Sequence, residues 1–188
     1  MDNHPSRTDV IARIDNEHVK WNALLAEIDP ASMDTPQTLG EWSFKDVVAH
    51  LTAWRQPYLD DYAVALGAPP PPPSAWPYAF AETDEDLPDG ESKVQTVNEW
   101  IYARNHDHPI DVVLAESQQQ WEQLRQIGED MPEAMLDDPE AFPKHAGRSL
   151  ADVIMTGDQF SHFHTEHEPV IRAWISGKEI SSDLGSTA

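Results

Sequence analysis

Residues 43–62, SFKDVVAHLTAWRQPYLDDY, contain the start signal and the apolar spacing of a helix that decides the fold. Ser43 and Asp46 match a capping box, in which each side chain accepts a hydrogen bond from the backbone N–H of the other residue. Apolar residues then recur every three or four positions, and this spacing places Phe44 and Leu51 on one face. The stretch therefore predicts an amphipathic helix that begins at Ser43.

The same start signal occurs three more times, each time before a segment with helical spacing. The other boxes pair Ser6 with Asp9, Ser92 with Gln95, and Ser149 with Asp152. We therefore expect four helices, at residues 6–28, 43–66, 92–128 and 149–176, with the third interrupted near Pro109. No segment alternates apolar and polar residues as a half-buried strand does. The predicted fold is all-α, an up-down four-helix bundle in a single domain that spans residues 1–188.

A proline-rich and acidic segment, residues 67–91, separates the second and third predicted helices. It contains GAPPPPPSAWP at 67–77 and ETDEDLPDGE at 82–91. This composition is typical of an extended spacer, so we expect a long crossover loop between two helices. The proline run also resembles ligands of proline-binding modules, although no basic residue flanks it. Residues 180–188 are small and polar, and we expect them to form a flexible tail.

The charge and the composition exclude several classes of function. Asp and Glu number 34 against 12 Lys and Arg, which gives a formal net charge of -22. Such a surface repels nucleic acid and anionic membranes, so neither is an expected partner. The chain has no cysteine, which excludes disulfides and thiolate nucleophiles. Neither a signal-peptide pattern nor an apolar run long enough to span a bilayer is visible, so we expect a cytoplasmic protein.

Three of the nine histidines fall within residues 162–167, HFHTEH. At about 100° per residue, His164 and His167 flank the apolar stripe of the last predicted helix. The same geometry points His162 toward solvent. Pro169 follows closely and cannot donate a backbone hydrogen bond, so an irregular turn is expected within this segment.

His50 lies at the margin of the apolar face of the second helix and can meet His164 and His167 if the two helices are neighbours. Three neutral imidazoles suit Zn²⁺ or Ni²⁺ with a fourth position open, so the predicted ligands of one divalent metal ion are His50, His164 and His167. Without a metal, His164 or His167 is a candidate catalytic general base. The alternative is that these histidines are only residues at the edge of an amphipathic core.

A pocket for a small-molecule substrate is expected between the second, third and fourth helices. The candidate lining residues are Trp54, Tyr58, Asn98 and Tyr102. Aromatic residues at helical spacing are often simply core, so this alternative also stands. His145 reads as an ordinary surface residue.

Three stretches carry a resemblance to a known family. They are GEWSFKDVVAHLTAW at 40–54, NEWIYARNHDHPIDVVLAESQQQWEQL at 98–124 and GDQFSHFHTEHEPVIRAWI at 157–175. Together they resemble the DinB/YfiT-like superfamily and, within it, the ClbS/DfsB branch. The resemblance implies a four-helix bundle, often a homodimer, with a divalent metal held by one histidine of the second helix and two of the fourth.

His50 and His167 match the positions that the resemblance assigns to metal ligands. The superfamily usually has another histidine four residues before the one that matches His167, but Phe163 occupies that position. His164 can replace this missing histidine because it points to the same side of the helix, and His162 can replace it if the helix bulges.

The resemblance suggests several activities. The ClbS/DfsB branch hydrolyses a reactive cyclopropane-bearing genotoxin and need not use a metal, whereas other members are thiol-dependent transferases or isomerases. We therefore expect a small-molecule hydrolase or transferase, metal-dependent or metal-independent. The alternatives are a non-catalytic protein that sequesters a small hydrophobic ligand and a degenerate DinB-like module.

Overall fold

The computed structural model describes residues 5–36, 38–39, 41–71 and 93–177. Within these residues every extended element is a helix: α1 Arg7–Ala26, α2 Phe44–Ala65, α3 Lys93–Asn105, α4 Ile110–Asp130, α5 Glu133–Leu136, α6 Leu150–Thr156, α7 Asp158–His162, a π-helical turn Phe163–His167, and α8 Glu168–Ile175. Short 3₁₀ turns cover Pro30–Ser32 and Pro143–His145. The described residues contain no strand, only one isolated bridge between Leu39 and Trp42. The predicted all-α class is confirmed.

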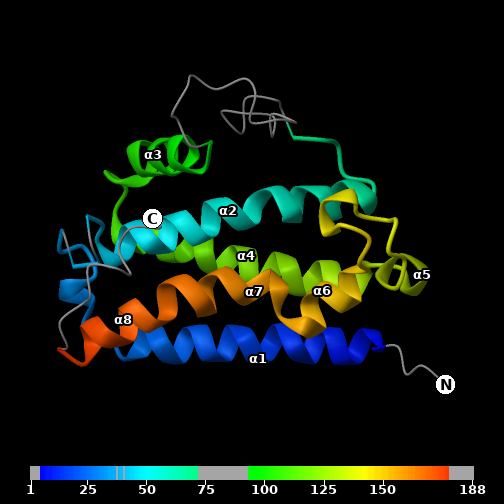
Figure 1. Ribbon diagram of the computed structural model, residues 1–188, viewed down its shortest axis with the longest axis horizontal. Coiled ribbons are helices and arrows are strands. Elements are labelled where there is room, and N and C mark those ends of the chain that lie inside the picture. The colour runs from blue at the N-terminus through cyan, green and yellow to red at the C-terminus, as the bar shows by residue number, and fades with distance from the viewer. Residues whose placement is uncertain (1–4, 37, 40, 72–92, 178–188) are drawn as a thin grey trace.

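The bundle consists of the helices α1, α2 and α4 and of a fourth, interrupted helical segment that runs from α6 to α8 (Figure 1). Helix α4 packs against both α1 and α2, and α1 packs against α6. Helices α2 and α4 run in the same direction, opposite to α1 and to the α6–α8 run. This arrangement requires the chain to cross back between α2 and α4. Most of the predicted crossover 67–91 and the whole predicted tail 180–188 lie outside the described residues.

Helix α3 is a separate element rather than the first half of a bundle helix. It packs on α2, and the chain turns between Asn105 and Ile110 before α4 begins. Pro109 stands at the N-cap of α4, where its missing N–H costs nothing. The predicted interruption is therefore confirmed, and α4 alone forms the third helix of the bundle.

The helix starts agree with the predicted capping residues wherever these are described. Ser6 and Ser43 each form a complete capping box, with Asp9 and Asp46 respectively. Ser149 accepts a hydrogen bond from the backbone N–H of Asp152 at the start of α6. Such caps contribute about 1 kcal/mol each. Ser92 lies outside the described residues.

The predicted continuous fourth helix, 149–176, is wrong in one respect. Gly157 has a φ of 86°, a left-handed conformation that ends α6 before α7 begins. A Cβ atom at Gly157 would also lie 2.9 Å from Nη2 of Arg13. Glycine is favoured there because of the left-handed backbone angle, whereas the guanidinium of Arg13 is the end of a flexible side chain that can shift.

Aromatic packing holds the C-terminal run against the rest of the bundle. The Trp21 ring of α1 lies 6.3 Å from the Phe44 ring of α2 and 5.2 Å from the Phe163 ring in the π-turn. Phe44 in turn stacks on Trp174 of α8 at 6.0 Å. Aromatic pairs at these distances add to the area that each ring buries. The π-turn is thus anchored to both α1 and α2. None of the helices in the described ranges combines the length and the apolar character needed to cross a membrane.

Candidate metal centre

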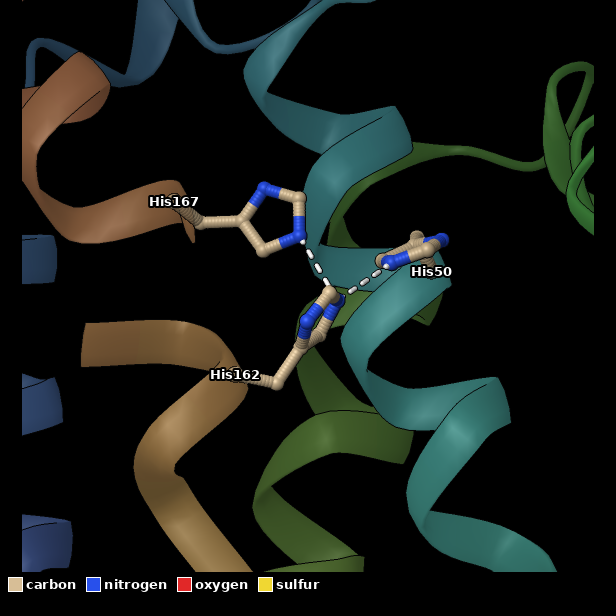
Figure 2. Close-up of side chains that lie close together, drawn as sticks. All are labelled: His50, His162 and His167. Carbon is tan, nitrogen blue, oxygen red and sulfur yellow. Dashed lines mark hydrogen bonds between the residues drawn. The ribbon is translucent and has the colours of Figure 1, made fainter. Parts of the chain in front are cut away.

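Three histidine side chains converge between α2 and the end of α7, and we call His50, His162 and His167 the histidine triad. Nε2 of His162 lies 3.1 Å from Nε2 of His50 and 3.1 Å from Nε2 of His167. Figure 2 shows the rings pointing toward one another, His50 from α2 and the other two from either end of the π-turn. Within the described chain this is the one group of at least three potential ligand side chains whose ligand atoms all lie within 4.8 Å of one another.

The π-turn brings His162 and His167 to the same face. The backbone N–H of Glu168 donates to the carbonyl oxygen of Phe163, five residues earlier rather than four. In an α-helix, residues five apart point about 140° away from each other. The wider turn absorbs one extra residue, so His162 takes the place relative to His167 that a residue four positions earlier has in a regular helix.

The expectation that His164 completes the triad is wrong, and the alternative, His162 in a bulged helix, agrees with the structure. His162 is exposed, as expected, but its Nε2 also reaches His50 and His167. His164 was expected to complete the triad, but both of its ring nitrogens face carboxylates. Its Nε2 lies 2.7 Å from Glu17 and its Nδ1 lies 2.6 Å from Glu168. The error comes from the assumption of a regular 100° step, which the π-turn breaks.

The buried carboxylate of Glu17 holds His164 away from the triad. The Glu17 side chain is 2 % exposed and also binds Lys20 at 2.8 Å and Arg13 at 3.2 Å. Its pKa is lowered because hydrogen bonds from Lys20 and His164 outweigh the opposing effect of burial, which is the largest single contribution. Neither ring nitrogen of His164 is left for a metal ion.

The donor set of the triad fits a cation. An imidazole Nε2 carries either one proton or one lone pair in the ring plane, so His162 cannot make two good hydrogen bonds, to His50 and to His167, at once. Three lone pairs aimed at a shared centre remove this conflict. Zinc–nitrogen bonds of about 2.0–2.1 Å in a tetrahedral site separate the ligand nitrogens by roughly 3.3 Å, close to the spacing seen here.

His50 and His167 are buried, whereas His162 is exposed at the mouth of the site, and burial favours the neutral, metal-binding form of the two buried rings. Burial, aided by the neighbouring imidazoles of His167 and His162, lowers the pKa of His50 to about 2. Burial also lowers the pKa of His167 to about 4, and the pKa of His162 is lowered for the same reason. The Nδ1 atom of His50 is buried without a hydrogen-bond partner in the described chain. The orientation of the His50 ring therefore depends on its contacts with the flanking rings of Trp42 and Trp54.

A cavity of about 460 Å³ lies beside the triad, and His50 and His162 are part of its wall. Trp54, Tyr58 and Asn98, three of the four candidate lining residues, also line this cavity, and their role toward a substrate stays a prediction. The indole N–H of Trp54 donates to Oδ1 of Asn98 at 2.8 Å, which holds both side chains in place. Tyr102 is not in the cavity wall and instead stacks between the rings of Trp42 and His106.

Neither His164 nor His167 is in the cavity wall, so the general-base role suggested for them stays a prediction. Sequence reasoning missed most of the other residues that line the cavity, among them Glu17, Arg55 and His145. His145 was expected at the surface but is buried and lies 2.9 Å from the hydroxyl of Tyr62. A signal existed for Glu17, which falls at helical spacing between the buried residues Ile14 and Trp21.

Comparison with known proteins identifies one family. A model of the DinB superfamily matches residues 13–167. No curated protein and no solved structure matches the chain. The matched region contains the whole histidine triad and the π-turn.

Proposed function

Because this chain belongs to the DinB superfamily, we propose that its histidine triad holds one divalent metal ion, zinc or nickel, in a small-molecule hydrolase or transferase. The observation that carries the proposal is the convergence of three Nε2 atoms from two separate segments of the chain. When bound, such an ion supplies Lewis-acid chemistry: it polarises an electrophile or lowers the pKa of a nucleophile in contact with it.

The chain itself provides binding and orientation. The cavity wall contains six Trp, Tyr and Phe side chains besides its charged and polar ones, and this aromatic surface favours an apolar or planar substrate body. The Trp54–Asn98 pair presents a fixed polar edge next to His50. Both His50 and His162 are in the wall, so a substrate in the cavity contacts the open side of the triad.

We further propose that the substrate is a reactive electrophile. The support is the resemblance of the quoted sequence stretches to the ClbS/DfsB branch, whose chemistry is the disarming of such a molecule. If the triad binds no metal, the same electrophile would be hydrolysed without a metal ion.

The second candidate function is sequestration without turnover, and the aromatic cavity favours it. A binding protein of this kind is stabilised by its ligand and releases it unchanged. Product formation from a trial electrophile separates the two functions, because only the enzyme consumes the compound.

The metal content of protein purified without an affinity tag tests the proposal. We expect near-stoichiometric zinc or nickel by plasma mass spectrometry in the wild type, and loss of the metal in His50→Ala and in His167→Ala. His18→Ala is the matched control, because His18 hydrogen-bonds Gln118 away from the triad. A wild type that folds but retains no metal when supplied with zinc and nickel would refute the metal centre.

A further inference from the structure

Arg55 is a cation in the cavity wall with no anionic partner. It lies on α2, and its guanidinium carbon sits 4.5 Å from the centre of the Trp121 ring. Its Nη1 atom is buried without a hydrogen bond, and the described part of the chain gives Arg55 neither a hydrogen bond nor an ion pair. The indole nitrogen of Trp121, another residue of the cavity wall, is also buried without a partner.

The other charged residues of this wall are paired. Arg148 binds Asp158, and Glu17 binds Arg13, Lys20 and His164. The protein as a whole carries 34 carboxylates against 12 Lys and Arg, yet none of those described reaches Arg55. Arg55 is half-buried, with Nη1 cut off from solvent, and a partly desolvated cation without an anionic partner is unfavourable. Burial lowers the pKa of Arg55 to about 10, so the guanidinium remains charged at neutral pH.

We propose that Arg55 binds the anionic group of the molecule that occupies this cavity, so that the ligand is an organic anion, such as a carboxylate, with an apolar or aromatic body. The guanidinium pairs with the anion, and Trp54, Trp121 and Phe160 surround the rest of the ligand. This inference deepens the proposed function and rests on it for the identity of the cavity as the substrate site.

The position of Arg55 also places the anionic group relative to the triad. Arg55 follows His50 by five residues on α2, which corresponds to a rise of about 7.5 Å along the helix axis. Along the axis of α2, the anionic group of the expected ligand therefore lies about 1.4 helical turns from the atom that contacts the triad, and the two side chains leave the helix about 140° apart.

The competing explanation is that Arg55 only packs on Trp121. Arg104 provides the matched comparison, because its guanidinium lies 5.4 Å from the Trp100 ring but is exposed and is not in the cavity wall. If Arg55 only packs on Trp121, then removing either arginine should affect the binding of charged and neutral ligands equally.

The test compares 1-naphthylacetate with its neutral amide, 1-naphthylacetamide. Binding is measured by calorimetry on metal-free full-length protein, so that coordination of the carboxylate by a metal ion cannot contribute. We expect the wild type to bind the anion about tenfold more tightly than the amide, as one charge-assisted pair would give. Arg55→Met should remove this preference, because it weakens binding of the anion by about tenfold more than binding of the amide, and binding of the amide that remains shows that the cavity is intact. Arg55→Lys should keep part of the preference, and Arg104→Met should keep all of it.

Two results would overturn the inference. One is a wild type that binds neither probe at millimolar concentration or binds both equally. The other is an Arg55→Met variant that keeps the preference for the anion. His167→Ala separates this inference from the metal proposal: it should lose metal yet still prefer the anion, so either proposal can fail alone.

Discussion

At the scale of single residues, buried charges and their partners organise the site. Glu17 joins α1 to the C-terminal run through His164, while Lys20 and Arg13 neutralise it from its own helix. His164 is thereby held away from the triad, and His162 is left as its third member. Glu17 thus acts on the site through the position of His164.

Replacement of Glu17 by glutamine should lower the free energy of unfolding by about 1–3 kcal/mol. The amide cannot accept the charge-assisted hydrogen bonds that the buried carboxylate receives. Urea denaturation measures this loss. Glu168→Gln is the control and should cost less, because the Glu168 side chain is 22 % exposed against 2 % for Glu17. Equal stability of Glu17→Gln and the wild type would show that the network does not stabilise the fold.

Sequence reasoning identified two members of the triad and gave the third, His162, only as an alternative in a bulged helix. His50 lies in the regular helix α2, and His167 ends the π-turn on the apolar side that its spacing predicted. The facing of His162 depends on a π-turn, and a fixed angle per residue cannot represent one. Pro169 indicates that the helix is irregular in this segment. It does not indicate which residues change the direction in which they point.

At the scale of elements, the π-turn is equivalent to one residue inserted into an α-helix. Phe163 stands four residues before His167, where the resemblance leads one to expect a histidine, and the wider turn moves His162 into that place. The extra residue is accommodated between α7 and α8. Phe163 is released to pack on Trp21, which stabilises the turn.

Deletion of Thr165 together with Pro169→Ala should convert the π-turn into a regular α-helix and preserve the site. Thr165 is exposed, and its deletion leaves His162 four residues before His167, the spacing that keeps two side chains on one face. The alanine restores the N–H that proline lacks. Thermal unfolding by circular dichroism and zinc stoichiometry are the measurements.

The control for this deletion removes Glu122, an exposed residue of α4, which is a regular helix. That deletion turns every later residue of α4 by about 100° and should unfold the protein. A Thr165 deletion variant that folds but no longer binds zinc would contradict the description of the π-turn as a single-residue insertion.

Other elements were predictable to different degrees. The helix starts were found because caps are local and depend on residues three apart. The break at Gly157 was missed, since the helical apolar spacing continues across it and does not register a single residue with a positive φ. The burial of His145 was missed because its partner Tyr62 lies on α2.

At the scale of the whole molecule, the triad links the two halves of the bundle. His50 comes from the α1–α2 half, and His162 and His167 come from the C-terminal run. A metal ion bound by all three therefore favours the folded state over the unfolded chain by mass action. The strongly acidic surface attracts divalent cations in general, so binding at the triad must be separated from surface binding.

Zinc at a free concentration of about 100 times its dissociation constant should raise the free energy of unfolding by about 2.7 kcal/mol. For a chain of this size the melting temperature should rise by roughly 5–10 °C. Differential scanning calorimetry with and without a chelator measures the shift. His167→Ala retains the acidic surface and should show no such rise; an equal rise in that variant would assign the stabilisation to surface binding.

Zinc titration of the metal-free wild type, His162→Ala and His164→Ala tests whether the π-turn makes His162 rather than His164 the third ligand. We expect one tight site in the wild type, weakened by more than about tenfold in His162→Ala and unchanged in His164→Ala. Loss of the site in His164→Ala with retention in His162→Ala would contradict the account, because the register of the helix would then be the regular one.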